Sequence, residues 1–369
     1  MPVKVVIVSK LVRGIYQRQL EEVAALDEVE LTVISPPSWR EGKNIIPLER
    51  RFTRGYELVV TPIVFNGHFH VHFYPRLAGL IRKLRPDILH VDEEPYNLAT
   101  WLALRAGEAI GARRLFYTWQ NIYRALPLPF ARIERENYRL ADGAIVASSD
   151  AEGVLRRKGF DRPIWLIPPG LDFDLYRPAE PAPDSEFVVG YVGRLVPEKG
   201  VDLLLRACQK LAPPWRLLLV GDGAGRAALA EQAAALGIAE RVSFVGALAS
   251  TAVPEVLRGL SVLVLPSRST PRWREQFGRV LVEAMASAVP VVGSDSGEIP
   301  KVIDDAGLVF PEDDWEALAD RLSQLQQSDS LRRTLAARGR ARALGRYSHR
   351  SVAEKTVAVY RSVLRSNVT

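Results

Sequence analysis

Short apolar runs alternate with helical patterns along most of the chain. Runs of about four to eight apolar or β-branched residues between polar ones predict buried strands, and apolar residues three or four positions apart predict helices. The strands predicted in the first half lie at 4–10, 29–35, 55–63, 87–92, 113–119 and 143–148. The helices predicted between them include 16–26, 76–84 and 98–110. This alternation predicts an α/β domain whose parallel sheet is covered by helices on both faces.

A break in the alternation divides the chain. The stretch 179–186 is AEPAPDSE, and its prolines and polar residues predict a linker. Strands are predicted again at 187–194, 215–223, 241–248, 261–267 and 289–294. A chain of 369 residues also exceeds one ordinary core. We therefore predict two Rossmann-like, doubly wound domains over 1–178 and 187–345, with a final helix over 346–369 that packs back on the first domain.

Composition narrows the class of protein and of its partners. An apolar content of 47% with 25% charged residues is typical of a globular protein, and the single cysteine, Cys208, suits a reducing compartment. The net charge of +6 and the pI of about 9.4 fit nucleic acid, a membrane surface or an anionic small ligand. No zinc-finger spacing or aromatic-rich RNA-binding strand is present in the sequence, so nucleic acid is not expected. The N-terminal apolar run is too short for a signal peptide, and we expect a cytoplasmic protein.

Two strand-end loops of the second half carry candidate chemistry, because parallel sheets bind ligands at the carboxyl ends of their strands. In the first loop Gly193, Arg194 and Lys199 follow a predicted strand. The two cations either bind one diphosphate, Arg194 as a fork and Lys199 as a point charge, or belong to a solvated surface loop. The second loop, 221–225, departs from the dinucleotide fingerprint, and we interpret it as a tight turn beside a nucleotide.

A third loop raises a question of charge. The stretch EQFGRVLVEAM places Gly278 before a predicted helix, whose free N–H groups suit an anion. Glu275 precedes that site and Glu283 follows it. A carboxylate only accepts hydrogen bonds, so each acid suits hydroxyls, and the order of hydroxyl, phosphate and hydroxyl fits a nucleotide sugar. The alternative is an amphipathic core helix with two exposed acids.

The first half carries candidates for a second ligand. His68, His70 and His72 alternate, so on a strand they would share one face and form a metal patch, line an acceptor site or be plain structure. Glu93 and Glu94 end a predicted strand, where they either bind acceptor hydroxyls or cap the next helix.

A basic amphipathic pattern lies in the same half. The stretch RLAGLIRKLRP, 76–86, alternates apolar residues with four cations. It either docks on anionic lipid at the inner face of the membrane, which would favour a lipid-linked acceptor, or it is a core helix with a solvated basic face.

These motifs resemble a known family over essentially the whole chain, most specifically in the second half. VGRLVPEKGVDLLL, VGDG, FVGAL and the stretch from EQFG to EIPKVI resemble the donor domain of family 4 glycosyltransferases, retaining enzymes of the GT-B fold with two Rossmann-like domains facing a central cleft. Glu275 and Glu283 match the family's E-x7-E pair, and 193–200 matches its G-R-x4-K-G element.

The resemblance implies a function. It implies a retaining hexosyltransferase that moves a sugar from a UDP- or GDP-sugar to a saccharide or lipid-linked acceptor, in cell-surface polysaccharide or glycolipid synthesis, with no cofactor and no metal. Two alternatives remain, namely a GT-B epimerase or phosphorylase and a nucleotide-sugar-binding protein without turnover.

The resemblance also implies residue roles. Arg194 and Lys199 would hold the diphosphate, Glu283 the ribose and Glu275 the transferred sugar. The other implied donor contacts are Gly193, Gly246, Leu248, Phe277, Gly278, Arg279 and Val280. The acceptor contacts that we predict from the first half of the chain are Gly14, His68, Glu93, Glu94 and Trp119. Gln120 stands where the family often has histidine, and it can hydrogen-bond at the catalytic site but cannot shuttle protons.

Overall fold

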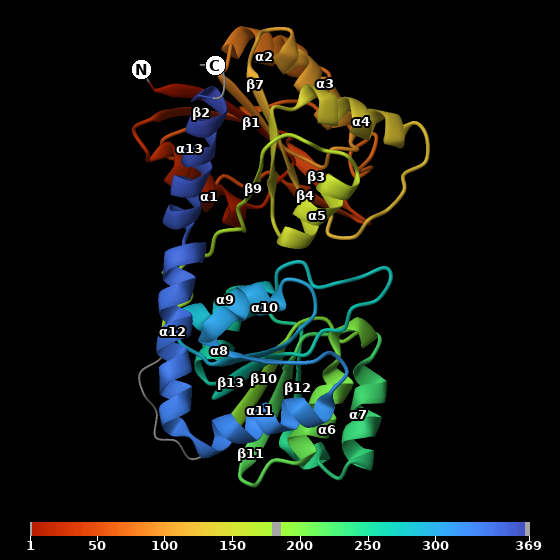
Figure 1. Ribbon diagram of the computed structural model, residues 1–369, viewed down its shortest axis with the longest axis vertical. Coiled ribbons are helices and arrows are strands. Elements are labelled where there is room, and N and C mark those ends of the chain that lie inside the picture. The colour runs from red at the N-terminus through yellow and green to blue at the C-terminus, as the bar shows by residue number, and fades with distance from the viewer. Residues whose placement is uncertain (1, 179–185, 366–369) are drawn as a thin grey trace. The chain divides into compact units, whose positions relative to one another are not determined.

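The computed structural model describes residues 2–178 and 186–365 (Figure 1). Contacts between Cα atoms divide the chain into two compact units. Unit 1 comprises 1–170 and 349–369, and unit 2 comprises 171–348.

Unit 1 is built on a seven-stranded parallel sheet in the order β5-β2-β1-β6-β7-β8-β9. Its strands are β1 (Val3–Ser9), β2 (Val29–Ser35), β5 (Glu57–Val60), β6 (Ile88–Asp92), β7 (Arg113–Thr118), β8 (Gly143–Val146) and β9 (Ile164–Leu166). A separate antiparallel pair, β3 (Ser38–Glu41) and β4 (Asn44–Pro47), was not predicted. Strand β9 and, in unit 2, β15 (Leu308–Phe310) were not predicted either, and each of these four strands has only three or four residues and lacks a long apolar run.

Helices cover both faces of this sheet, as predicted. They are α1 (Gln17–Ala24), α2 (Leu77–Leu84), α3 (Leu98–Glu108), α4 (Phe130–Leu140), α5 (Ser149–Arg157) and α13 (His349–Arg365), with the 3₁₀ turn η1 (Gly14–Tyr16). Successive residues of a strand point to opposite faces. Val6 and Val8 of β1 therefore pack in the core under α2 to α5, and Val5 and Ile7 pack in the core under α1 and α13.

The C-terminal helix α13 begins at His349 and completes the second of these cores. It packs against α1, and its Tyr360 side chain is fully buried and lies with Oη 2.9 Å from His90 Nδ1 of β6. The last residues of the predicted helix, 366–369, lie outside the described residues.

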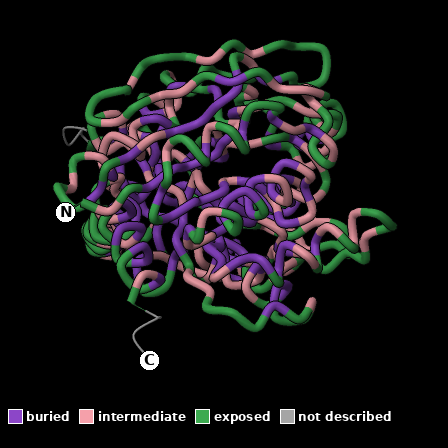
Figure 2. The backbone as a smooth tube through the Cα atoms, turned by 90° about the horizontal axis from the view of Figure 1, so that it is seen from above, coloured by how far each residue is buried: buried purple, intermediate pink, exposed green. Residues whose placement is uncertain are grey.

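Unit 2 repeats the design with a six-stranded parallel sheet in the order β12-β11-β10-β13-β14-β15. Its strands are β10 (Phe187–Val192), β11 (Trp215–Val220), β12 (Val242–Gly246), β13 (Val262–Leu265), β14 (Val291–Ser294) and β15 (Leu308–Phe310). Its helices are α6 (Val201–Gln209), α7 (Arg226–Ala235), α8 (Val253–Arg258), α9 (Arg279–Ala286), α10 (Ile299–Ile303), α11 (Trp315–Gln327) and α12 (Asp329–Tyr347), with 3₁₀ turns η2 (Pro197–Lys199), η3 (Ala239–Arg241) and η4 (Asp304–Ala306). Figure 2 shows the buried chain segments in purple and the exposed ones in green.

The boundary between the units differs from the predicted one at 178. Residues 171–178 belong to unit 2 because they bind its last helix. Leu171 N donates to Tyr347 O at 2.7 Å, and Arg340 Nη1 donates to Tyr176 O at 3.0 Å. Most of the predicted linker, 179–185, lies outside the described residues.

Candidate functional site

Three strand-end loops of unit 2 meet at one edge of its sheet. Gly193 N, after β10, donates to Val220 O at 2.9 Å, and Gly221 N, after β11, donates to Gly246 O at 2.8 Å. A Cβ at position 221, where φ is +133°, would lie 1.8 Å from Gly193 O. Only glycine fits there. The loop after β11 is thus the tight turn that the sequence predicts.

The loop after β10 is packed directly against the loop after β13. A Cβ on Gly200, where φ is +65°, would lie 1.9 Å from Pro266 O. Lys199 Nζ lies 2.6 Å from Glu275 Oε2, and only 14% and 12% of these two side chains are exposed. The fold therefore joins Lys199 and Glu275, 76 positions apart in the sequence, in one largely buried ion pair.

Two further residues, which the sequence analysis did not predict, contact this ion pair. Ser267 Oγ donates to the same Glu275 oxygen at 3.0 Å. Lys199 Nζ lies 4.6 Å from the centre of the Trp273 ring, within the range of a cation–π contact. Only the nearness of both residues to Glu275 in the sequence could have signalled them.

Gly278 begins helix α9, as the sequence predicts. It is the N-cap, with φ +71° and ψ +49°, and the helix runs from Arg279. Its Cα is held against Leu265 and Leu281, since a Cβ there would lie 3.0–3.1 Å from their side chains. The first N–H groups of a helix have no partner within it, so Arg279 and Val280 present anion-binding groups.

The second acid of the pair, Glu283, lies within α9 and is almost buried. Arg279 Nε donates to its Oε1 at 2.9 Å, and the Tyr176 hydroxyl forms a second hydrogen bond with it. Burial raises the pKa of Glu283, and the charge of Arg279 and both hydrogen bonds oppose that rise. Tyr176 was missed, because it lies more than 100 positions before Glu283.

The remaining predicted donor-binding residues differ in their exposure and in the groups that they can present to a ligand. The Arg194 side chain is 64% exposed and forms an ion pair with Glu198 at 3.7 Å, so it can turn to a ligand at little cost. Phe277 is buried against Tyr347, with ring centres 5.4 Å apart, and offers only its backbone. Gly246 ends the edge strand β12 with φ +86°, and Leu248 beyond it is exposed.

In unit 1, Glu93 is buried at the carboxyl end of β6. It forms an ion pair with Lys10, lies 3.3 Å from His72 Nε2, and accepts a hydrogen bond from Asn97 Nδ2 at 3.1 Å. Burial raises the pKa of Glu93, but Lys10 and His72 outweigh burial, so the pKa is lowered overall. Lys10 and His72 are thus the partners of a predicted acceptor residue.

Glu94 is held by the next strand rather than by the next helix. It accepts hydrogen bonds from Thr118 Oγ1 at 2.5 Å and from Trp119 N at 2.9 Å, and burial raises its pKa. The N-cap of α3 is Asn97, whose side chain makes no capping hydrogen bond, so neither Glu93 nor Glu94 is the capping residue. The alternative in which these acids cap the helix is therefore wrong.

The three histidines do not lie on a strand. The chain turns here, because His72 N donates to His68 O at 3.0 Å. His72 is buried, His70 stacks on Tyr96 with ring centres 5.3 Å apart, and His68 is exposed. They therefore do not form the shared strand face that alternate positions suggest, and in the described parts of the chain no three His, Cys, Asp or Glu residues are grouped to hold a metal.

Gln120 follows β7 and is oriented by a buried ion pair. Lys158 Nζ donates to Gln120 Oε1 at 3.0 Å and to Glu134 Oε1 at 2.7 Å. A lysine only donates, so the amide oxygen of Gln120 faces Lys158 and its NH₂ group remains to donate elsewhere. Neither Lys158 nor Glu134 could be found from sequence spacing.

Gly14 lies in a closed position of unit 1. Its N–H donates to Glu49 Oε2 at 2.6 Å, and a Cβ there would lie 2.7 Å from Arg51 Cβ. Within unit 1 its amide is therefore already bonded to a carboxylate.

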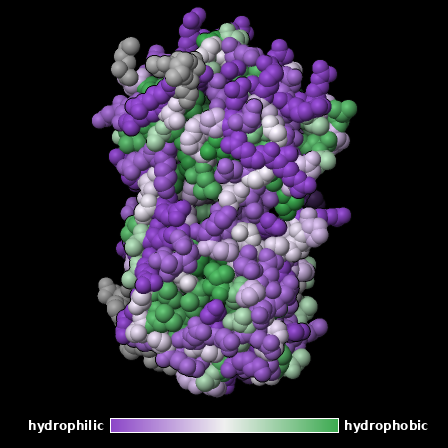
Figure 3. Space-filling view, in the orientation of Figure 1, coloured by the Kyte–Doolittle hydropathy of each residue, from purple (hydrophilic) through white to green (hydrophobic). Residues whose placement is uncertain are grey.

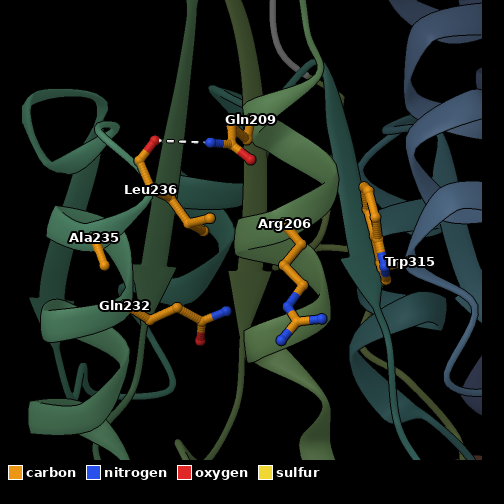
Figure 4. A pocket seen from close by; sticks show the side chains of 6 residues that line it. All are labelled: Arg206, Gln209, Gln232, Ala235, Leu236 and Trp315. Atoms are coloured by element: carbon orange, nitrogen blue, oxygen red, sulfur yellow. Dashed lines mark hydrogen bonds between the residues drawn. The ribbon is translucent and has the colours of Figure 1, made fainter.

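A shallow groove elsewhere in unit 2 contains none of the predicted residues (Figure 4). It is lined by Arg206, Gln209, Gln232, Ala235, Leu236 and Trp315. These side chains come from the flanking helices α6, α7 and α11 and the residue after α7, away from the strand-end loops.

Comparisons with known proteins identify the family to which this chain belongs. The model for glycosyl transferases group 1 matches residues 172–342, and the model for glycosyltransferase family 4 matches 17–175. An alpha-maltose-1-phosphate synthase of Mycolicibacterium smegmatis is 30% identical over 328 residues, which are 80% of this chain and 78% of that protein. The chain belongs to glycosyltransferase family 4. A D-inositol 3-phosphate glycosyltransferase of Stackebrandtia nassauensis is 30% identical over 309 residues, 74% of this chain and 68% of that protein.

A solved structure shows the same fold. Anabaena HepE in complex with UDP has a TM-score of 0.71 and 18% identity, covering 98% of this chain and 100% of that one. The chain whose sequence is given above therefore has the GT-B fold, as that sequence predicts.

The close approach at Gly200 yields a prediction for this family 4 glycosyltransferase. Gly200→Ala should destabilise unit 2, because its Cβ must push the Pro266 carbonyl away and separate the two loops. Gly237→Ala is the matched control, with φ +70° and nothing within 4 Å of its Cβ. The control should lose only the roughly 1–2 kcal/mol of a left-handed alanine. Urea unfolding of both variants measures the difference, and equal losses would refute the contact.

Proposed function

We propose that the protein is a retaining hexosyltransferase that uses a nucleotide-diphosphate sugar. One observation carries the proposal: the buried Lys199–Glu275 pair and Glu283 flank the N-terminus of α9. A ligand held there needs hydroxyls at both ends and negative charge between them. Similar structures of Anabaena HepE hold UDP or UDP-glucose, and UDP-glucose has this order of groups.

The diphosphate would lie against the first N–H groups of α9. Lys199 has three donors and gives one to Glu275, so it can bind a phosphate without leaving its partner. Arg194, which is exposed, would close over the same diphosphate as a fork.

The two acids would hold the two sugars. Arg279 and the Tyr176 hydroxyl occupy two acceptor positions of Glu283, and a carboxylate has about four, so ribose hydroxyls can donate to the remaining ones. Glu275 is fixed by Lys199 and Ser267, and it would accept a hydroxyl of the transferred sugar.

The acceptor would bind unit 1, where the amide of Gln120 can donate to its oxygen atoms. Gln120 takes up no proton. In the proposed step the bond from the anomeric carbon to the diphosphate oxygen breaks, and the acceptor oxygen bonds to that carbon on the same face. The leaving diphosphate takes the acceptor's proton, so no protein base is needed.

A second prediction separates the roles of the two acids, Glu275 and Glu283. Glu283→Ala should weaken UDP binding and raise the donor KM, because ribose contacts persist from ground state to transition state. Glu275→Gln should spare UDP affinity but lower kcat, by about 10²–10³-fold if its contact strengthens in the transition state. Calorimetric titration of UDP and of GDP, with kinetics on the matching glucose donors, tests both roles.

The outcomes of this experiment distinguish the candidate functions. Loss of nucleotide affinity in Glu275→Gln alone would reverse the two roles. Turnover of the donor to an epimer, or to a sugar phosphate when phosphate is added, would identify an epimerase or phosphorylase. Nucleotide binding without any turnover across saccharide and lipid acceptors would identify a binding protein.

We also propose that transfer needs no metal, because Lys199 and the α9 N-terminus already supply positive charge to the diphosphate. Turnover should persist in EDTA. Complete loss, restored by Mg²⁺ or Mn²⁺ but not by Ca²⁺, would contradict this.

We further propose that unit 1 docks on an anionic membrane, which suits a lipid-linked acceptor and a role in cell-surface polysaccharide or glycolipid synthesis at the inner face of the membrane. No helix in the described parts of the chain has the length and apolar character to cross a bilayer. Helices α2, α3 and α4 pack side by side and carry a basic outer surface. Its exposed cations are Arg76, Arg82, Lys83, Arg85, Arg105, Arg132, Arg135 and Arg139.

An apolar side chain stands beside this basic surface. Leu128, just before α4 and between two prolines, is 75% exposed, more than any other large apolar side chain in the described residues. Figure 3 shows an apolar patch, in green, at the edge of unit 1 where Figure 1 shows the loop before α4. The apolar residues of α2, by contrast, pack on the core.

Vesicle binding tests the docking proposal. The double variant Arg132→Glu/Arg135→Glu should bind vesicles containing phosphatidylglycerol at least about tenfold more weakly, since each cation near such a surface contributes roughly 1 kcal/mol. Leu128→Asp should also weaken binding, while Ile45→Asp, which changes a side chain that is 56% exposed on β4, should not. Sedimentation with anionic and with phosphatidylcholine vesicles measures this. Equal binding by all variants would contradict the proposal.

A further inference from the structure

For Lys199 and Glu275 to form their ion pair, the two loops that carry these residues must be held at a fixed distance from each other. They follow β10 and β13, which pair in the sheet but lie far apart in the sequence. The residue after Ser267 is Arg268, and it does not belong to the donor contacts proposed above.

Arg268 binds the first of these loops through its backbone and its side chain. Its N donates to Glu198 O at 2.8 Å. Its Nη1 and Nη2 bind the two oxygens of Asp202 at 2.8 and 2.6 Å, and Nη1 also reaches Pro197 O at 3.2 Å. These partners border Lys199 on both sides.

The same guanidinium reaches a third loop. Arg268 Nε lies 2.5 Å from Asp313 Oδ1, after β15. The side chain is 22% exposed, so this arrangement is partly shielded from solvent. A planar fork can hold two oxygens of one carboxylate and a second carboxylate in fixed directions, which a lysine cannot do.

We propose that Arg268 is a positioning residue for the donor: it does not touch the ligand but holds the Lys199 loop at bonding distance from Glu275. The inference rests on the proposed function, because it assumes that Lys199 binds the diphosphate. It predicts that Arg268 matters to donor affinity only while Lys199 is present.

Arg342 provides a matched control within unit 2. Its Nε donates to Val302 O at 2.8 Å, Nη1 to Asp304 at 2.7 Å and Nη2 to Lys301 O at 2.6 Å. It thus makes a comparable set of bonds, but it joins α12 to the end of α10 rather than to the donor loops.

The experiment is calorimetric titration of UDP and GDP into the full chain and its variants. Arg268→Met should bind the preferred nucleotide roughly tenfold more weakly, a change of about 1.4 kcal/mol. Arg268→Lys should recover little of this loss, because it lacks the fork. Arg342→Met should bind as the natural chain does, even though it loses thermal stability.

A double-mutant cycle distinguishes positioning from a general structural effect. In a Lys199→Met background, Arg268→Met should cause almost no further loss of affinity. An equal loss in both backgrounds, or unchanged affinity in Arg268→Met, would overturn the role of Arg268 alone. If Arg268→Met does not fold, Asp202→Asn is used in the same cycle with the same expectation. If the natural chain binds neither nucleotide, the proposed function falls, and this inference falls with it.

Discussion

The buried pair of Lys199 and Glu275 is the interaction on which the edge of unit 2 depends. Each side chain is almost out of water, and an unpaired charge there would cost several kcal/mol. The loop after β10 therefore cannot move away from the loop after β13 without leaving two charges unsatisfied. Ser267 adds a hydrogen bond to the same carboxylate, so Glu275 is held in one place.

Close backbone contact makes this pairing possible. Gly200 lies against Pro266 and Gly221 against Gly193, and at each position a Cβ would lie less than 2 Å from a carbonyl oxygen. A third glycine, Gly297, lies against the carbonyl of Glu275 itself, 2.1 Å from where its Cβ would be. Because the backbones of these loops lie so close together, side chains at their surfaces, such as those of Ser267 and Glu275, can reach hydrogen-bonding distance.

In unit 1 the charged side chains at the strand ends bond to neighbouring strands and loops. Glu93 and Glu94 are bonded to groups from other strands and loops, so they hold strand ends together. The pair of Lys158 and Glu134 sets the direction of the Gln120 amide. Both units thus place polar groups at the carboxyl ends of parallel strands and fix them by partners that are remote in sequence.

Most strands and helices, and the local motifs, could be predicted from the order of the amino acids alone. Apolar runs and helical spacing identify strands and helices because each depends on neighbouring residues, and the helix start at Gly278 between Glu275 and Glu283 is set within nine positions. Which side chains contact each other became visible only in the folded chain. The fold joined Lys199 to Glu275 and Tyr176 to Glu283, turned the chain where alternate histidines suggested a strand, and assigned 171–178 to unit 2. These contacts join residues that lie far apart in the chain, or replace a local pattern by hydrogen bonds, and spacing along the sequence encodes neither.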